Sequence, residues 1–307
     1  MADVIATHLE MARSGVDKYY PIFGKDRRKW YTQIGFRPET TSMQFIRMFQ
    51  EGGYGFATVV NEGGAIPVDT FATVNNKDYY WVKRGLQDRR SYESISTDQY
   101  GLSKKVAKKM AKAMESTKDS TAAAMFNKHT STSGAFVGPD GVAFVSATHG
   151  YDGGTWSNLG VDESNTSADL SMSALDGMIQ QLMLVPNHRG IPDPQPGPFN
   201  LMVHPKNASL AHRISETLKI QGSANNDVTF GGALISNVIV NPFLTELGAW
   251  WLIAANSDDH GLFMLRHDSR LIESDRHKET QEVSIFLTEK WLFHFMDARG
   301  VQGSAGA

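Results

Sequence analysis

The hydrophobic pattern of this chain first indicates one long helix. Apolar positions recur every three or four residues within 93–127, which is the period of a helix that buries one face. The stripe consists of Leu102, Val106, Met110, Ala113 and Met114, continued less regularly by Ala122, Met125 and Phe126. This spacing predicts an amphipathic helix that packs against a larger body.

Residues 50–85 have a different pattern, typical of a long two-stranded excursion. Polar and apolar side chains alternate at 54–60, an Asn-Glu-Gly-Gly turn signal follows at 61–64, and strand-like runs return at 70–74 and 79–83. No third strand is evident beside this hairpin, and an isolated hairpin is marginally stable in water. We therefore expect the excursion to find its partner elsewhere, for example on another copy of the chain.

The segment after the long helix predicts a tight hairpin. Short strand-like runs at 135–137 and 142–145 flank the sequence Gly-Pro-Asp-Gly at 138–141. Proline presets φ at the second turn position, aspartate tolerates the third, and glycine closes the turn. We expect the hairpin to lead into a glycine-rich loop at 149–154.

Residues 165–275 alternate between helical and strand-like patterns, which predicts an α/β module. Ser171 caps its first helix, and a second helix is expected at 206–219. Apolar strands are expected at 199–203, 236–240, 249–254 and 262–265. Alternation at 281–297 predicts a long final strand, and the small residues at 303–307 are expected to fray.

Composition places the chain among ordinary globular proteins. Its 307 residues are 41% hydrophobic and 21% charged, enough to bury a sizeable core in two domains or in one with insertions. The net charge of −3 gives no support for a dedicated nucleic-acid binder. Because the chain has no cysteine, disulfides, thiolate catalysis and cysteine-based zinc sites are excluded.

The sequence also gives no sign of a membrane segment. No run approaches the roughly 20 apolar residues that span a bilayer. The first residues lack the apolar stretch of a secretory signal. We therefore expect a protein that is made and used in a cytoplasm and has no membrane partner.

Two basic groups can be interpreted either as solvated or as binding surfaces. Opposite the apolar stripe of the long helix are Lys104, Lys105, Lys108, Lys109 and Lys112. These lysines either face solvent or face nucleic acid or an acidic partner. Arg27 and Arg28 belong to a basic run beside Trp30 and Tyr31. That run either marks a partner surface or adjoins aromatic residues tucked under the same domain.

Motifs of nucleotide binding and hydrolysis are missing from the sequence. It has no phosphate-binding glycine loop, no His-Glu-x-x-His and no Gly-x-Ser-x-Gly. The densest ionisable cluster is Asp258, Asp259 and His260, followed by His267 and Asp268. Residues seven apart face opposite sides of a strand, so His260 and His267 are not expected to share a metal. We expect neither a metal nor another cofactor.

The glycine-rich loop contains a second candidate for catalysis, His149 with Asp152. The two side chains could form an acid–base pair. Alternatively, they fix the geometry of the loop through hydrogen bonds. His188, His204 and His294 stand alone in the sequence and are expected to be structural.

Short motifs between the long helix and the α/β module occur in a defined order. They are a Phe-Asn pair at 126–127, Gly-Pro-Asp-Gly at 138–141, Ser-x-x-His at 146–149 and Gly-Thr-x-x-Asn at 154–158. Further motifs are Gly-x-Ile-Pro at 64–67, Glu93, Ala-Leu at 174–175, Pro-x-x-Leu-x-Val-x-Pro at 198–205, Pro-x-Leu at 242–244 and Ala-Trp at 249–250. In this order, from about residue 50 to 297, the chain resembles the major head subunits of Mu-like phages and prophages.

The resemblance implies an α+β protein with the Hong Kong 97-type phage capsid fold. Such a fold has an N-terminal arm, an extended β-hairpin loop, a peripheral domain with a long spine helix, and an axial α/β domain. Transferred to this sequence, the arm is 1–49 and the extended loop is 50–85. The peripheral domain is 86–165 with 276–307, and the axial domain is 166–275.

The function implied by the resemblance is that of a major capsid protein. Such a protein self-assembles into hexamers and pentamers that form an icosahedral head shell enclosing double-stranded DNA. Its partners would be other copies of itself, portal and scaffolding proteins, and DNA bound without sequence specificity. It would reside in the virion after assembly in the host bacterial cytoplasm. The short arm before the extended loop implies either a separate scaffolding protein or a processed N-terminus.

Two alternatives to the capsid function remain open from the sequence. An encapsulin-type compartment shell protein shares the fold and encloses cargo enzymes. An α/β metal-dependent hydrolase would use His149, Asp152 or the cluster at 258–268. The capsid function, in contrast, involves no catalytic site.

Under the resemblance, assembly contacts are expected in the arm and the extended loop. The residues are Arg27, Arg28, Glu62, Ile66, Pro67, Phe71, Lys77, Tyr80 and Trp81. Lys77 is also a candidate for a covalent cross-link to a neighbouring copy. The lysine face of the spine helix is expected to face DNA or a scaffolding protein.

Overall fold

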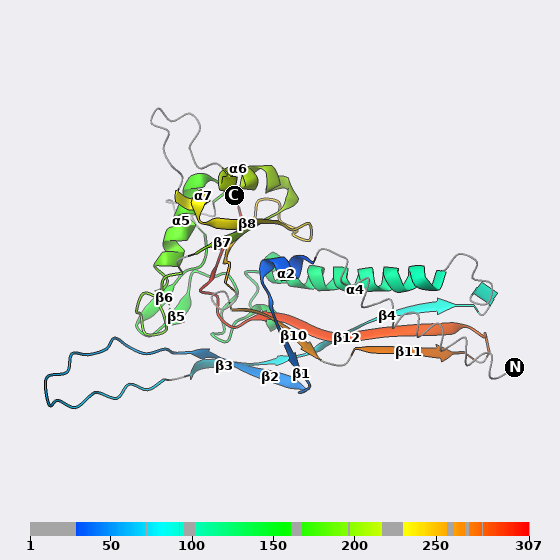
Figure 1. Cartoon of the computed structure of the whole chain (residues 1–307), viewed down its shortest axis with the longest axis horizontal. Helices are drawn as coiled ribbons and strands as arrows, with labels where there is room; N and C mark the ends of the chain where they lie inside the picture. The colour runs from blue at the N-terminus through cyan, green and yellow to red at the C-terminus, as the bar shows by residue number, and fades with distance from the viewer. Residues whose placement is uncertain are drawn as a thin grey trace.

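A computed structural model of the whole chain shows an elongated molecule with an α/β body at one side, a long sheet under a helix, and a projecting loop (Figure 1). The residues that the structure describes are 29–71, 73–91, 93–94, 102–160, 168–195, 197–216, 230–256, 261–267, 270–277 and 279–306.

The long sheet is built around one central strand, β12 (Val283–Phe295). Strand β4 (Val82–Arg90) pairs antiparallel with it on one side. On the other side lie β11 (Leu271–Arg276) and β10 (Leu262–His267), and β10 pairs parallel with β1 (Arg37–Thr41). The long final strand that the sequence predicts is therefore confirmed. It is the spine of the sheet.

Helix α4 (Leu102–Asn127) lies along this sheet (Figure 1) and contacts β12 and β4. Met110, Met114, Met125 and Phe126 are buried, as the apolar stripe predicts. Ala113 is exposed, so its placement in the stripe is wrong. At about 100° per residue it lies well outside the face that Met110, Met114 and Met125 share.

The α/β body has its own four-stranded sheet, in the order β13-β9-β7-β8. The strands are β7 (Phe199–Val203), β8 (Ile235–Val240), β9 (Trp250–Ala254) and β13 (Val301–Ser304). The helices are α5 (Met172–Met183), α6 (Ala208–Glu216) and the short α7 (Phe230–Ala233), with a 3-10 turn η2 (Pro205–Asn207) before α6. The predicted strands at 199–203, 236–240 and 249–254 and the Ser171 cap are confirmed, the Ser171 hydroxyl accepting a hydrogen bond from the Ala174 amide at 3.2 Å. The predicted strand at 262–265 is present as β10, but its placement in this module is wrong, because it pairs with β12 and β1 in the long sheet.

Strand β9 shows why these apolar runs are continuous. Trp250 and Leu252 pack into the cluster beneath α5 and α6. Trp251 and Ile253 pack into the opposite cluster, which α4 and β12 share. Because successive side chains of a strand point to opposite faces, a sheet buried on both sides needs apolar residues at every position.

The small-residue tail does not fray over the part that the structure describes. Gly303 and Ser304 are buried in β13, which pairs with β9, so the prediction of a frayed end is wrong at these positions. A Cβ on Gly303 would lie 2.8 Å from Cδ1 of Trp251. Small residues therefore allow the close approach of β13 to the Trp251 ring.

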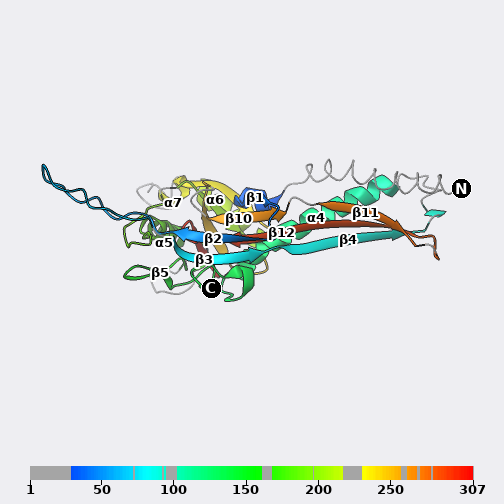
Figure 2. The ribbon, with the colours of Figure 1, turned by 90° about the horizontal axis from the view of Figure 1, so that it is seen from below.

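The excursion consists of a paired root and an unpaired projection. Its root is an antiparallel ribbon of β2 (Phe45–Glu51) and β3 (Thr73–Tyr80). Residues 52–71 project beyond this ribbon along the long axis of the molecule (Figure 2). The turn signal at 61–64 is confirmed by a 2.8 Å hydrogen bond from the Gly64 amide to the Asn61 carbonyl. The predicted strand at 54–60 is wrong, because this segment forms no ladder with the opposite limb.

Two short hairpins follow α4. The predicted turn at 138–141 is confirmed, since the Gly141 amide donates to the Gly138 carbonyl at 3.1 Å. Its predicted flanking strands are wrong: a 3-10 turn, η1 (Gly134–Phe136), precedes a single bridge between Val137 and Ala143. The glycine-rich loop is itself a hairpin of β5 (His149–Tyr151) and β6 (Gly154–Trp156).

Candidate assembly surfaces

The inner face of the excursion root is fixed to the long sheet. Met48 and Tyr79 are buried against Leu265 and Leu292. The Tyr79 hydroxyl donates to the Phe295 carbonyl at 2.9 Å. This packing sets the direction in which the excursion leaves the molecule.

His294 lies beneath this root and is fully buried. Its ring stacks on Tyr79, with centroids 4.2 Å apart, and on Phe263 at 5.6 Å. Burial lowers the pKa of His294 to about 3, so the ring is neutral at physiological pH. His294 acts as a flat packing element between the ribbon and the sheet.

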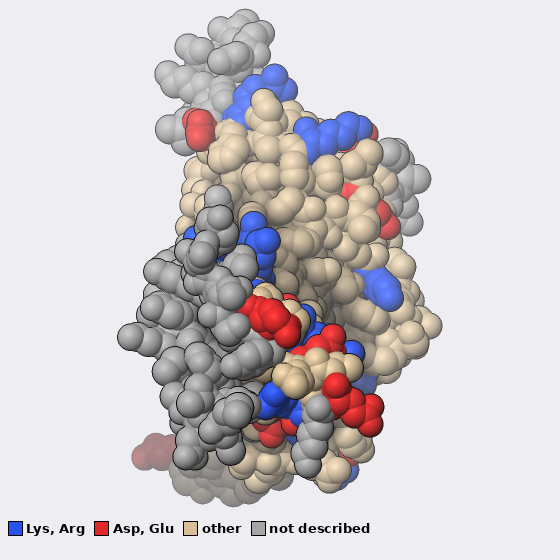
Figure 3. All heavy atoms as spheres, turned by 90° about the vertical axis from the view of Figure 1, so that its right-hand side faces the viewer, with Lys and Arg blue, Asp and Glu red and all other residues tan. Residues whose placement is uncertain are grey.

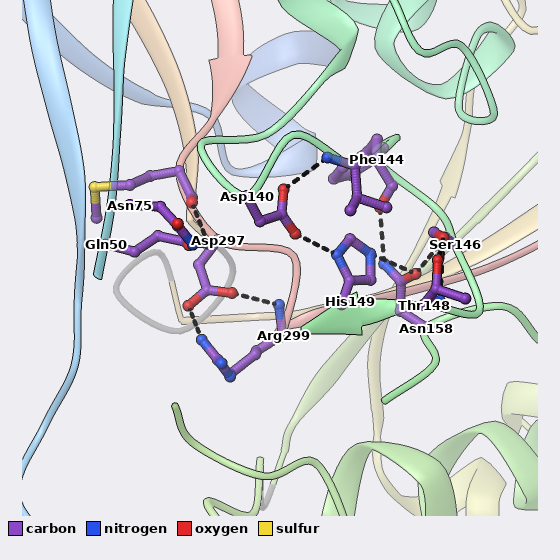
Figure 4. Close-up of polar contacts among 12 residues, drawn as sticks. Gln50, Asn75, Asp140, Phe144, Ser146, Thr148, His149, Asn158, Asp297 and Arg299 are labelled. Carbon is purple, nitrogen blue, oxygen red and sulfur yellow. Dashed lines mark hydrogen bonds and ion pairs between the residues drawn. The ribbon is translucent and has the colours of Figure 1, made fainter. Parts of the chain in front are cut away.

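Polar side chains complete the anchoring of the root (Figure 4). The Gln50 amide donates to the Met296 carbonyl at 3.1 Å, and Asn75 donates to Gln50 at 3.0 Å. The Lys77 ammonium donates to the carbonyls of Gly134, at 2.8 Å, and Val137. Burial lowers the pKa of Lys77. Lys77 therefore has partners within its own chain, and its predicted role between subunits stays a prediction.

The projecting part of the excursion exposes a set of apolar side chains. The exposed fractions are 77% for Phe56, 95% for Val59, 80% for Ile66 and 90% for Val68. Of the predicted assembly contacts, Glu62, Ile66, Pro67 and Phe71 lie on this segment and are exposed. A projecting segment with this many exposed apolar side chains is typical of a surface that a partner covers.

An ion pair holds the base of the projection. Asp69 accepts hydrogen bonds from the Gly55 amide at 2.7 Å and from Arg189 at 2.9 Å. The Gly55 amide, and next to it the Arg189 guanidinium, lower the pKa of Asp69. Arg189 follows α5, so this contact connects the two limbs of the projection to the α/β body.

Two more predicted contacts, Tyr80 and Trp81, lie at the opposite end of the ribbon. Tyr80 is exposed and packs on Phe45, with ring centroids 5.7 Å apart. The Trp81 indole donates to the Met43 carbonyl at 2.7 Å. A hollow of about 390 Å³ opens beside these two rings.

The aromatic residues of the arm are tucked against the rest of the chain. Trp30 and Tyr31 begin α2 (Trp30–Ile34), whose first amides donate to Asp119 at 2.9 and 3.2 Å. The Trp30 indole donates to the Val240 carbonyl at 2.7 Å. Of the two alternatives for this run, the structure therefore supports tucked aromatics at Trp30 and Tyr31. Arg27 and Arg28 lie outside the described residues.

The lysine face of α4 is on the surface, as predicted. The exposed lysines are Lys105, Lys108, Lys109 and Lys112, whereas the side chain of Lys104 lies outside the described part. Figure 3 views the end of the molecule where α4 begins, and there basic and acidic side chains lie side by side. What these lysines face in an assembly remains a prediction.

A buried charge cluster joins α4 to the sheet, and the apolar pattern missed it. The Lys118 ammonium lies 2.9 Å from a Glu115 oxygen and 2.7 Å from a Glu289 oxygen of β12. The same ammonium is 5.4 Å from the centroid of the Trp291 ring. Lys29 reaches Glu115 at 3.4 Å. The charged residues Glu115 and Lys118 on the inner side of α4 were the signal in the sequence. Charges inside a core must be paired, so they could have indicated this cluster.

His149 connects the two hairpins (Figure 4). Its Nδ1 lies 2.7 Å from Asp140 and its Nε2 lies 3.1 Å from the side-chain oxygen of Asn158. Asn158 also accepts from the Ser146 amide at 2.8 Å and donates to the Phe144 carbonyl at 2.8 Å. Both ring nitrogens of the buried His149 therefore have partners, and the ring connects the 138–141 turn to the segment after β6.

Asp152 has no part in this contact. Its backbone amide donates to the His188 carbonyl at 2.8 Å, and its side chain is exposed. The predicted pair of His149 with Asp152 is therefore wrong, and the carboxylate that contacts His149 is that of Asp140. Of the two alternatives for this loop, the geometry supports the one in which His149 fixes its shape.

The remaining isolated histidines also make structural contacts. Arg299 contacts Nε2 of His188 at 3.2 Å, pairs with Asp297 and donates to the Pro186 carbonyl at 2.8 Å. Burial, and then the Arg299 charge, lower the pKa of His188. His204 accepts from the Lys206 amide at 3.1 Å and so caps η2.

The candidate metal cluster can be traced only in part. His267 lies at the end of β10 with its ring 5.9 Å from Trp81, whereas Asp258, Asp259, His260 and Asp268 lie outside the described residues. Among the residues that are described, no three histidines or carboxylates lie close enough together to hold a metal. No helix among them combines the length and apolar character needed to span a membrane.

Comparison with known proteins identifies the family of the chain. A family profile described as phage capsid protein matches residues 77–285, about two thirds of the sequence. A search of curated proteins gives no significant match.

Solved shell structures have the same fold. The virus-like particle of Pyrococcus furiosus aligns with a TM-score of 0.56 at 12% identity, over 96% of this chain and 98% of that one. The capsid of cyanophage P-SCSP1u gives 0.56 at 12% identity, over 89% and 86%. The holo-SrpI encapsulin complex of Synechococcus elongatus gives 0.53 at 9% identity, over 90% and 87%. These alignments confirm the predicted α+β, Hong Kong 97-type fold, and with the profile match they show that the chain belongs to the phage capsid protein family as a major capsid shell protein.

Proposed function

We propose that copies of this chain assemble into hexamers and pentamers that close an icosahedral head shell around double-stranded DNA. The observation that carries this proposal is the projection at 52–71. It holds Phe56, Val59, Ile66 and Val68 at exposed fractions of 77% or more, far from its own core. Burial of apolar surface stabilises contacts by about 25 cal/mol per Å². A neighbouring copy that covers this segment would provide that burial.

Within the proposed shell, each part of the chain has a distinct task. We assign 1–49 to the N-terminal arm, 50–85 to the extended loop, 86–165 with 276–307 to the peripheral domain, and 166–275 to the axial domain. Strand pairing supports two adjustments, because β10 and β11 lie in the sheet of β12 whereas β13 lies in the sheet of β7.

Many modest contacts suit such a shell better than one tight contact. A standard stable interface buries on the order of 1,600 Å². Contacts repeated around a closed lattice give high avidity, while weak early contacts still allow misplaced subunits to dissociate. The root of the loop is packed on the long sheet and its projection forms no strand pairs, which fits a subunit that adapts to slightly different neighbours.

Further partners follow from the same proposal. Portal and scaffolding proteins would join the shell during assembly in the host bacterial cytoplasm, and the finished protein would reside in the virion. The exposed lysines of α4, Lys105, Lys108, Lys109 and Lys112, would face packaged DNA or a scaffolding protein. The chain would act through assembly and not through catalysis, which agrees with the structural role of His149.

An encapsulin-type compartment shell is the second candidate function. The observation that favours it is the alignment with the holo-SrpI encapsulin complex, which covers 90% of this chain. The two functions differ in content, because one shell encloses DNA and the other encloses protein cargo. The match to the phage capsid family favours the first.

Sedimentation of the protein purified from phage-producing cells tests the proposal. We expect particles far heavier than the 33.9 kDa subunit, with nuclease-resistant DNA inside. Particles that contain protein cargo and no DNA would favour the compartment shell. A species of one or a few copies under all conditions would contradict both.

A further inference from the structure

The β2–β3 ribbon has two chemically different ends. Its Glu51–Thr73 end leads into the projection, and its Phe45–Tyr80 end lies beside the 390 Å³ hollow. In both Figure 1 and Figure 2 the projection points away from the rest of the ribbon. A residue at the tip of the projection therefore cannot reach the hollow of its own chain.

The hollow contains an unfavourable pair of like charges. Lys83 of β4 and Lys290 of β12 are directly opposite in the antiparallel register, and both line the hollow. Opposed residues of such a pair have Cβ atoms about 5 Å apart, and like charges there are destabilising. Neither lysine has an ion pair with a carboxylate among the described residues. An anion between them would relieve this repulsion.

The hollow has aromatic, polar and basic walls, lined by Tyr80, Trp81, Ser42, Gln44, His267 and the two lysines. Trp81 and the exposed Tyr80 form one side of it, and the exposed side chains of Met43 and Val82 are close by in sequence. The hollow therefore combines two basic side chains with aromatic and polar neighbours, and exposed apolar side chains adjoin its lining residues in the sequence. The matching segment would carry one carboxylate flanked by aliphatic side chains.

The tip of the projection has this composition. Glu62 is the only acidic residue between Gly52 and Val68, and it follows Val59 and Val60 and precedes Ile66. Its side chain is exposed and has no cationic partner among the described residues. The only other carboxylate of the projection, Asp69, is held by Arg189.

We infer that Glu62 of one copy binds between Lys83 and Lys290 of the next copy. The inference rests on the proposed self-assembly and names the receptor of the loop. Because the acid lies beyond one end of the β2–β3 ribbon and the lysine pair lies beside the other end, the contact is head-to-tail. Head-to-tail contacts generate a ring when the rotations between successive copies add up to a full turn. Each copy in the ring would place its own Glu62 on one neighbour and bind the Glu62 of the other neighbour.

Cross-linking tests this contact directly, because the chain has no cysteine of its own. A variant with Glu62→Cys and Lys290→Cys is assembled and treated with a short bis-maleimide. A flexible linker is preferable to a disulfide, which tolerates only a narrow range of Cα separations. We expect a ladder of covalent oligomers in a denaturing gel.

The control pairs Glu62→Cys with Lys206→Cys, an exposed lysine just before α6 in the α/β body. It should give no ladder. Wild-type shells combined with no ladder from the Glu62–Lys290 variant would overturn the contact and leave the proposed function intact. Wild-type protein that forms no shells would overturn both.

Charge reversal provides an independent test. Glu62→Lys alone, or Lys83→Glu with Lys290→Glu, should each lower the yield of particles about tenfold, because like charges then face each other. All three changes together should restore the yield to within about threefold of the wild type. As a matched control, Lys105→Glu with Lys206→Glu should not rescue Glu62→Lys.

Circular dichroism of the subunits separates a folding defect from an assembly defect. Folded subunits without rescue would contradict the contact. A phosphate-binding hollow would behave differently again: the lysine reversals would reduce DNA content while Glu62→Lys had no effect. That outcome would also overturn the inference.

Discussion

His149 illustrates how a residue that looks catalytic in the sequence becomes structural in the fold. A histidine in a glycine-rich loop invites an acid–base role, and Asp152 is its nearest acidic neighbour in that loop. In the structure the ring instead joins Asp140 of one hairpin to Asn158 beyond the other. Asp140 is nine residues away, and sequence proximity could not identify it as the partner.

We therefore expect His149→Ala to unfold more easily. The change removes the ring that Asp140 and Asn158 both contact and leaves a gap where this ring stacks on Trp156. This loss should lower the free energy of unfolding by about 3 kcal/mol. Urea denaturation of unassembled subunits measures this change. His212→Ala on the exposed face of α6 is the control and should change stability by less than about 0.5 kcal/mol. Equal stabilities of the two variants would contradict a structural role for His149.

Lys118 is the second residue whose role depends on the fold. It is buried between Glu115 and Glu289, and its stem lies in the apolar stripe of α4. Lys118→Met keeps the apolar stem and removes the charge, which leaves two carboxylates close together. We expect the free energy of unfolding to fall by about 3–5 kcal/mol, as measured by denaturant titration. Lys105→Met, on the exposed face of the same helix, should leave the free energy of unfolding nearly unchanged. If both variants lost the same stability, the buried cluster would not be important for folding.

At the scale of elements, the sequence predicted strands with strong apolar runs and missed those defined by pairing. The runs in β7, β8, β9 and β12 are continuous or long, so their burial could be read from composition. Strand β13 has the sequence Val-Gln-Gly-Ser, and only its pairing with β9 reveals it. Residues 54–60 show the converse, because they alternate like a strand but pair with no strand in the part of the chain that the structure describes.

Gly303→Ala tests the packing of β13. The new methyl group would lie 2.8 Å from the Trp251 ring, so β13 or the ring must move. We expect a loss of about 1–3 kcal/mol, detected as a lower thermal midpoint. Gly150→Ala is the matched control, because a Cβ there meets nothing within 4 Å. A thermal midpoint unchanged by Gly303→Ala would show that β13 packs less closely than the structure indicates.

Shortening the projection tests its role in assembly. The contact between Gly55 and Asp69 brings the two limbs together, so residues 57–67 can be replaced by two glycines without disturbing the root. We expect a subunit with wild-type circular dichroism that remains unassembled in size-exclusion chromatography with light scattering. Normal particles from this variant would show that the projection is not required.

At the scale of the whole molecule, the fold could be predicted and the surfaces only in part. Hydrophobic periodicity predicted the long helix and the α/β alternation, whereas the Hong Kong 97-type fold was predicted from the resemblance in the order of motifs. The hollow beside Trp81 could not be predicted, since it combines Lys83 of β4 with Lys290 of β12, more than two hundred residues apart. The excursion and its missing partner were predicted from the sequence, but the exposure of its apolar side chains and the lack of a ladder at 54–60 became clear only in the structure.

The elongated shape fits a subunit that assembles with copies of itself. Its long sheet, its projecting loop and its α/β body extend in different directions (Figure 1). A subunit of this shape offers several separate contact surfaces, and modest contacts repeated over many copies produce a stable closed particle. The family match and the shell structures with the same fold agree with this design.

Electron cryo-microscopy of the purified protein tests the central claim most directly. The account predicts closed shells with fivefold and sixfold capsomers, in which the segment 52–71 of each copy lies on a neighbouring copy. Protein that stays as single subunits, or shells in which this segment contacts only its own chain, would contradict the account.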